Sequence, residues 1–219
     1  MEKWDQTDQA VQLKPLGINY RVYVPNGYEH DADQAWPLVV FLQGARQRGN
    51  NSGLLEEHGP LKEAAGGKEF PFLLLAPQCP EDTVWIMQKD IVIGSIRSVQ
   101  REYRVDPLRI YLTGISMGGF GTWEIAMEHP DLFAAIVPIC GGGMSWRLSN
   151  LQHMPIWTFH GAKDEIVPIG YTVEMMRALK ALGNQALFTV LPGAGHDCWT
   201  ESYRRDDLYE WLLKQKRQQ

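Results

Sequence analysis

The sequence has few cysteines, no long apolar run and no strong excess of charge, and each absence excludes a class of protein. Its 219 residues include three cysteines, which are widely spaced and form no CxxC pair, so neither a redox motif nor a dense disulfide framework is expected. No window is long and apolar enough to span a bilayer. The net charge of -5 would repel nucleic acid and anionic lipid. We therefore expect neither nucleic acid nor a membrane as a partner.

Export signals and cofactor motifs are also missing. The first residues, Met1 to Asp8, are polar and acidic and lack the basic start and apolar stretch of a secretory signal. Together with the scattered cysteines, this indicates a reducing compartment, and we expect a cytoplasmic protein. The phosphate-binding pattern GxxxxGK[ST] is absent, and the histidines and cysteines have no metal-ligand spacing. No cofactor or metal is predicted. The sequence does not indicate whether the protein is a monomer or an oligomer.

What the sequence contains is an ordinary globular composition, with 44% hydrophobic and 21% charged residues. Apolar runs alternate with segments of helical periodicity, which is typical of a mostly parallel sheet with helices on both faces. The predicted buried strands are residues 38–42, 72–75, 109–112, 134–137 and 156–159. Residues 18–24 alternate in polarity and predict an antiparallel edge strand. Because no repeat, linker or composition break interrupts the chain, we predict one α/β domain over residues 1–219, with a core at about 18–213 and polar termini.

The strongest motif is Gly114-Ile115-Ser116-Met117-Gly118-Gly119, which follows a predicted strand and precedes the helix-like stretch 120–128. In this GxSxG pattern the serine lies on a sharp turn between strand and helix, and the glycines let the two elements approach closely. The turn exposes the serine hydroxyl near the free N–H groups of the helix start. Ser116 is therefore the candidate nucleophile. A chance match among 21 glycines is the alternative, and the placement between strand and helix disfavours it.

A serine nucleophile needs a histidine base and a carboxylate that orients this base. Asp164 lies in a loop after the predicted strand 156–159, and His196 lies in a glycine-rich loop after the strand-like segment 186–191. Both loops follow the carboxyl ends of strands, where the sites of open α/β sheets lie. We therefore predict Asp164 as the acid and His196 as the base.

Other residues compete for both roles. Glu165 is the rival acid because it adjoins Asp164, and His160 is the rival base, although its position in the chain suits the strand of the acid. Asp197 is expected to point into solvent. The remaining histidines are expected to be structural or solvated; they are His30, His58, His129 and His153.

In this order, the segments GISMGG, HGAKDEIVP and GAGHDCW resemble the α/β-hydrolase superfamily. Within it they are similar to small carboxylesterases of the dienelactone-hydrolase and prolyl-oligopeptidase-related branch, over about residues 20–211. The resemblance implies a catalytic triad of Ser116, His196 and Asp164 that needs no metal or cofactor. It also implies an oxyanion hole built from the N–H groups of Ala45 and Met117.

The loop after the predicted strand 38–42 departs from the pattern of the family. Gln43 stands where the family usually has a histidine, and Arg46 stands where a glycine is common. The course of the loop is therefore open, although neither change removes a backbone amide. Arg46 and Arg48 are either a clamp for an acidic substrate or solvated surface residues.

The segment 141–155, where many relatives insert a lid, is short, and this predicts an open cleft with no large lid. Trp85 and Trp199 are candidate substrate contacts, with Trp146 as a third; core packing is the alternative for all three. An open cleft favours small esters with short or aromatic acyl groups. We predict a serine carboxylesterase that acts on a small-molecule ester through an acyl-enzyme. The alternatives are a lysophospholipase or thioesterase, a peptidase, and a non-catalytic ligand-binding module on the same fold.

Overall fold

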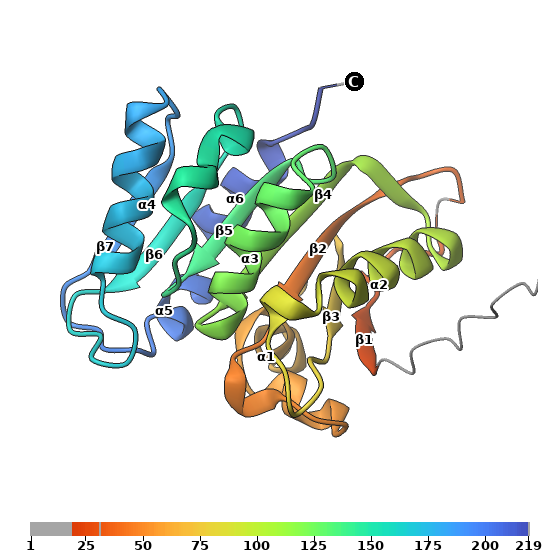
Figure 1. The fold of residues 1–219 in the computed structure, drawn as a ribbon. Helices are drawn as coiled ribbons and strands as arrows, with labels where there is room; N and C mark the ends of the chain where they lie inside the picture. The colour runs from red at the N-terminus through yellow and green to blue at the C-terminus, as the bar shows by residue number, and fades with distance from the viewer. Residues whose placement is uncertain (1–18, 31, 219) are drawn as a thin grey trace, which may run out of the picture.

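The computed structural model describes residues 19–30 and 32–218. The polar start Met1 to Asp8 and Ile18, the first residue of the predicted edge strand, lie outside the described residues. In the described part of the chain, seven strands form one sheet in the order β1-β3-β2-β4-β5-β6-β7 (Figure 1). The strands are β1 (Tyr20–Tyr23), β2 (Trp36–Leu42), β3 (Leu73–Pro77), β4 (Val105–Ile115), β5 (Ala135–Ile139), β6 (Trp157–Gly161) and β7 (Leu187–Leu191).

The strand β1 is antiparallel to β3, and the other neighbouring strands of the sheet are parallel. The predicted mostly parallel sheet is thus confirmed. The short edge strand lies at the predicted place and ends at Tyr23, before Pro25. The strand β4 begins at Val105, earlier than the sequence pattern predicts, because its first half is only partly buried and lacks the continuous apolar run of the other strands.

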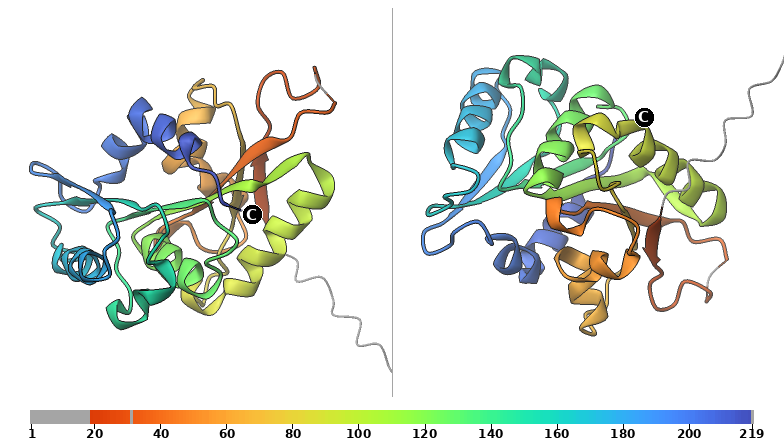
Figure 2. Two further views of the ribbon diagram at one scale, coloured as in Figure 1. Left: turned by 90° about the horizontal axis from the view of Figure 1, so that it is seen from above. Right: turned by 60° about the horizontal axis from the view of Figure 1, so that its bottom comes forward.

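Helices cover both faces of the sheet (Figures 1 and 2). The helices are α1 (Gly59–Ala65), α2 (Lys89–Glu102), α3 (Met117–Glu128), α4 (Gly170–Ala181), α5 (Trp199–Arg204) and α6 (Asp206–Lys214). Four short 3₁₀ helices complete the described part: η1 (Ala45–Gln47), η2 (Ser52–Glu56), η3 (Trp85–Met87) and η4 (Ser145–Leu151). Side chains of α2, α3 and α4 belong to the core on one face, and those of α1, α5 and α6 belong to the core on the other.

The central strands are apolar at every position because both of their faces are buried. In β2, Leu38, Val40 and Leu42 join one core, whereas Val39 and Phe41 join the other. None of the five side chains is exposed to solvent. A continuous apolar run is therefore the sequence pattern of a strand between two helical layers.

Parallel pairing brings the carboxyl ends of the central strands to one edge of the sheet, which faces forward in the right-hand view of Figure 2. Leu42 is paired with Gly114, Ile115 with Ile139, and Gly161 with Leu191. The loops that follow β2, β4, β6 and β7 consequently start side by side. Among the helices that the structure describes, none has the length and apolar character needed to cross a membrane.

The start of α3 lies unusually close to the end of β2. A Cβ atom at Gly118 would lie 2.0 Å from the carbonyl oxygen of Leu42, and a Cβ atom at Gly114 would lie 2.4 Å from the carbonyl oxygen of Gly118. Only glycine fits at these two positions, because both obstacles are backbone atoms and cannot rotate away.

We expect Gly118→Ala to lower the free energy of unfolding by about 1–3 kcal/mol or more, as overpacking of a core does. Gly94→Ala is the matched control, because Gly94 is exposed in α2 and no atom lies within 4 Å of its added Cβ. This control should gain up to about 1 kcal/mol from helix propensity. Urea unfolding followed by circular dichroism measures both changes. Equal stability of the Gly118→Ala variant and the wild type would contradict the close approach.

Candidate active site

Ser116 lies at the turn between β4 and α3, with a positive φ of 52° and a ψ of -117°. This conformation is rare for a residue with a side chain and costs on the order of 1–3 kcal/mol. Backbone hydrogen bonds hold it: the N–H of Ser116 donates to Ile139 O at 3.0 Å, and the N–H of Phe120 donates to Ser116 O at 3.0 Å. The side chain is thereby held above the carboxyl edge of the sheet.

A continuous row of hydrogen bonds joins Ser116, His196 and Asp164. The Ser116 Oγ lies 2.9 Å from His196 Nε2, and His196 Nδ1 lies 2.8 Å from Asp164 Oδ2. An ionised carboxylate only accepts hydrogen bonds, so His196 Nδ1 carries the proton and Nε2 is left to accept from the serine. The structure therefore brings together the three residues that the sequence analysis named. This is the geometry in which a histidine can take a proton from a serine.

Asp164 has a partner for each of its oxygens. Its Oδ1 accepts hydrogen bonds from the N–H groups of Ile166 and Val167, at 3.0 and 2.8 Å. Its side chain is fully buried, which by itself would raise the pKa of the carboxyl, but the hydrogen bonds from His196 and the two backbone amides hold this pKa below its ordinary value. The acid is therefore ionised at neutral pH. The rival acid, Glu165, is exposed.

His160, the rival base, supports Asp164 from the other side. Its Nε2 lies 3.2 Å from Asp164 Oδ2 and 2.8 Å from the carbonyl oxygen of Val167. Its Nδ1 lies 2.7 Å from Thr172 Oγ1. Burial lowers the pKa of His160, so the ring is neutral, and Nε2 carries its proton because the Val167 carbonyl can only accept. Both nitrogens are thus engaged away from Ser116.

Gln43, which stands where the family usually has a histidine, holds the loop after β2 in place. Gln43 is buried, and with its amide oriented to match its neighbours, the side chain donates to Pro77 O at 3.0 Å and accepts from Cys79 N at 2.8 Å. Its backbone carbonyl also accepts a hydrogen bond from Trp85 Nε1 at 3.0 Å. Gln43 therefore ties this loop to the segment that follows β3.

Ala45 and Met117 begin η1 and α3. The first N–H groups of a helix have no partner within the helix, so both amides are free of intrahelical hydrogen bonds.

Arg46 and Arg48, in the same loop, differ in their contacts. Arg48 donates to Ala45 O at 2.9 Å and to Thr83 O at 3.1 Å, so it holds the loop; Arg46 is exposed at the cleft.

A cleft of about 460 Å³ surrounds the hydroxyl of Ser116. Its lining residues are Gly44, Ala45, Arg46, Gln47, His58, Ile115, Ser116, Ile166, His196, Asp197 and Trp199. In the described part of the chain, no lining residue comes from the segment 141–155, in agreement with the predicted absence of a large lid. Asp197 is exposed, as expected, and accepts hydrogen bonds from the N–H and hydroxyl of Thr200 at the start of α5.

The three candidate tryptophans lie in different surroundings. Trp199 lines the cleft, and its ring packs edge-on against His196 with the ring centres 5.2 Å apart. Trp85 is fully buried in the core against Gly121 of α3, so its assignment as a substrate contact is corrected: its indole supports the loop at Gln43 from below. Trp146 is exposed on η4 and is not a lining residue either.

Two residues at the site have no signal in the sequence. His58 lines the cleft although it lies in no recognisable motif. Cys140, at the end of β5, has a positive φ of 42° and accepts a hydrogen bond from the N–H of Ser116 at 3.3 Å. Burial raises the pKa of the Cys140 thiol well above its ordinary value, so it is a neutral support beneath the serine.

The sulfur of Cys140, the carboxylate of Asp164 and the imidazole of His196 lie within 4.8 Å of one another, as metal ligands can. The hydrogen bond between His196 Nδ1 and Asp164 Oδ2 already accounts for the close approach of the last two. The contact of Cys140 with the N–H of Ser116 accounts for the position of the sulfur.

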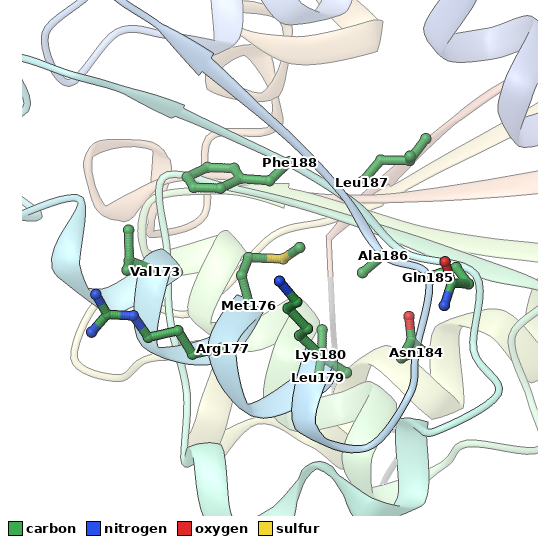
Figure 3. Close-up of a pocket in the computed structure, with 10 residues that line it drawn as sticks. All are labelled: Val173, Met176, Arg177, Leu179, Lys180, Asn184, Gln185, Ala186, Leu187 and Phe188. Carbon is green, nitrogen blue, oxygen red and sulfur yellow. The ribbon is translucent and has the colours of Figure 1, made fainter.

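A second hollow of about 500 Å³ lies between α4 and the edge strand β7 (Figure 3). Met176 and Lys180 extend from α4 towards Phe188 of β7, whereas Arg177 points away from them (Figure 3). Its lining residues include no serine, cysteine, histidine or carboxylate. Its titratable lining residues are Arg177 and Lys180, and among the described residues it has no hydrogen-bonded row like the one that joins Ser116, His196 and Asp164.

Comparison with known proteins gives a consistent result. Residues 65–211 match the sequence model of the phospholipase/carboxylesterase family. The chain is 30% identical over 143 residues to poly(3-hydroxyalkanoate) depolymerase C of Paucimonas lemoignei, covering 58% of this chain and 32% of that protein. It is 27% identical over 163 residues to the bifunctional acetylxylan esterase/xylanase XynS20E of Neocallimastix patriciarum, covering 69% of this chain and 22% of that protein.

Among solved structures, a thermostable esterase is similar, with a TM-score of 0.79 and 34% sequence identity; the match covers 91% of this chain and 60% of the esterase. The matches span between 22% and 41% of the length of the first three curated relatives.

The environment of Asp164 predicts how stability depends on pH. The folded protein lowers the pKa of this carboxyl, so ionised Asp164 contributes to the free energy of unfolding above pH 3.8, the ordinary value of its pKa. This contribution is lost as the pH falls through the lowered pKa. We expect Asp164→Asn to lower the free energy of unfolding near neutral pH by about 1–3 kcal/mol, because buried donors lose their charged partner. The difference between wild type and variant should shrink on acidification below pH 4 or so.

Urea unfolding at a series of pH values measures this difference. Asp131→Asn, which alters an exposed carboxyl at the opposite end of α3, is the matched control and should show no such trend. A difference between wild type and Asp164→Asn that is independent of pH would contradict the assigned ionised state.

Proposed function

Because the chain belongs to the phospholipase/carboxylesterase family of α/β-hydrolases, we propose that it hydrolyses carboxylic esters with Ser116, His196 and Asp164 as catalytic residues. The observation that carries this proposal is the row of two hydrogen bonds, 2.9 and 2.8 Å long, from Ser116 Oγ through His196 to Asp164. A serine linked in this way to a histidine and an ionised carboxylate has the base that nucleophilic attack requires.

In the proposed mechanism, Ser116 Oγ attacks the carbonyl carbon of the ester while His196 Nε2 takes the hydroxyl proton. Asp164 holds the imidazole in the required tautomer and stabilises its positive charge. The N–H groups of Ala45 and Met117 bind the oxyanion, a role supported by their positions at the first residues of η1 and α3. His196 then donates the proton to the leaving alcohol, and water hydrolyses the acyl-enzyme by the same steps in reverse order.

The proposed substrates are small esters with short-chain or aromatic acyl groups. A cleft of about 460 Å³ without a lid from the segment 141–155 offers little apolar surface to a long acyl chain. Ile115 and Ile166 are the larger aliphatic side chains that line it, and Trp199 adds an aromatic ring. Relatives whose names describe an acetylxylan esterase and a poly(3-hydroxyalkanoate) depolymerase support an ester as the bond that is cleaved.

Hydrolysis of p-nitrophenyl acetate, butyrate, octanoate and laurate tests the proposal. We expect kcat/KM to fall as the acyl chain lengthens, because the longer chains leave apolar surface in water. Ser116→Ala should lose activity by a factor on the order of 10³ or more, because the nucleophile is removed. Ser149→Ala, which alters an exposed serine of η4, is the matched control and should retain wild-type rates.

Labelling with a fluorophosphonate gives an independent readout. The activated serine should form a covalent adduct at Ser116, located by peptide mass spectrometry, and the Ser116→Ala variant should stay unlabelled. A wild-type protein that neither reacts with the probe nor hydrolyses any of these esters would overturn the proposal and would favour a ligand-binding module.

A further inference from the structure

No hydrogen bond within the described residues explains the place of the His58 side chain in the cleft wall. His58 is the N-cap residue of α1, but its side chain makes no capping hydrogen bond. Its Nδ1 is buried and has no hydrogen-bond partner among the described residues. A buried nitrogen without a hydrogen-bond partner lowers the stability of the fold. A residue that costs stability in a cleft is a candidate for a functional role.

The backbone holds His58 in a fixed position. Gly59 has a positive φ of 71°, and a Cβ atom there would lie 2.3 Å from the ring of Phe41. Pro60 follows in the first turn of α1. Only a glycine permits this close approach of the chain to Phe41. The imidazole therefore projects from a rigid turn, as a binding group must if it is to select between substrates.

Trp199 connects His58 to the catalytic base. The centre of its ring lies 5.2 Å from that of His196 and 5.5 Å from that of His58, and both contacts are edge-to-face. The two imidazoles thus pack against the same indole. All three residues line the cleft. In the proposed mechanism His196 protonates the leaving alcohol, so an alcohol that reaches His196 would lie near Trp199, the ring against which His58 packs.

His58 is uncharged in this environment. Burial lowers its pKa, and the positive charges of Lys62 and Arg46 act in the same direction, against the opposing effects of Asp197 and Glu57. A neutral imidazole has one nitrogen that donates and one that accepts. A hydroxyl group can pair with either nitrogen, because it also donates and accepts. A carboxylate or an ammonium group would have no charged partner in His58.

We propose that His58 is a specificity residue that binds, through Nε2, a hydroxyl group on the alcohol portion of the substrate ester. The nitrogen is assigned by elimination, because Nδ1 is buried, whereas the ring as a whole is only half-buried and lines the cleft. The substrate class is an ester of a polyhydroxylated alcohol, such as a glycerol or sugar monoester. This inference rests on the proposed hydrolysis of esters by Ser116.

Two esters of the same acid test the proposal, because only their alcohols differ: glyceryl monoacetate and propyl acetate. The measured quantity is the ratio of kcat/KM for the glyceryl ester to that for the propyl ester. His58→Phe removes both nitrogens but keeps an aromatic ring against Trp199, and we expect this ratio to fall about fivefold to tenfold, the value of one neutral hydrogen bond.

His58→Gln places an amide near the position of Nε2, and we expect it to restore the ratio to within about threefold of wild type. A purely structural role would not produce this rescue. His153→Gln makes the same chemical change in an exposed loop before β6 and serves as the matched control, with an unchanged ratio.

Each contrary result has a distinct meaning. Equal losses on both esters in His58→Phe would overturn the hydroxyl contact and leave only a packing role. Failure of His58→Gln to exceed His58→Phe would overturn the hydrogen bond. A wild-type protein that reacts with fluorophosphonate and hydrolyses p-nitrophenyl acetate, but shows no preference for the glyceryl ester, would overturn this proposal alone. Absence of the Ser116 adduct would instead overturn ester hydrolysis and this proposal with it.

Discussion

The strained turn at Ser116 depends on the close contact between the start of α3 and the ends of β2 and β5. A serine at a φ of 52° is unfavourable in isolation, so its surroundings have to hold it. The carbonyl oxygen of Leu42 would lie 2.0 Å from a Cβ at Gly118, and Ile139 accepts the N–H of Ser116 itself. The stability of the parallel sheet thus maintains the strained conformation of Ser116, and a looser sheet would let the turn relax.

Most of the fold and three residues of the site could be predicted because they leave local patterns. Central strands of a sheet covered on both faces need apolar residues at every position, as in β2 and β3. The turn at Ser116 needs small residues on both sides of the serine, and these appear as GxSxG. Asp164 and His196 follow two strands directly, so the parallel topology alone places them at the same edge.

The remaining residues of the site depend on tertiary packing that no local pattern records. His58 enters the cleft because Gly59 turns the chain against Phe41, which is distant in sequence. Trp85 is of a residue type that often contacts substrates, but its side chain packs against Gly121 and its Nε1 donates a hydrogen bond to the carbonyl oxygen of Gln43. A tryptophan reads the same in sequence whether its ring lies in a cleft or beneath one, and only the packing of neighbouring elements distinguishes the two.

Two histidines, His160 and His196, contact the carboxylate of Asp164, and both contacts are to the same oxygen, Oδ2. His160 and the amides of Ile166 and Val167 stabilise the ionised form, which allows the charge to remain in a buried position. Each of these donors also draws charge away from Oδ2 and so weakens the stabilisation of a positive His196. Because His160 shares its proton with the Val167 carbonyl at 2.8 Å, its contact with Asp164 at 3.2 Å is the longer of the two. Asp164 therefore remains ionised. Of its two histidine contacts, the shorter one, at 2.8 Å, is to His196, which also contacts Ser116.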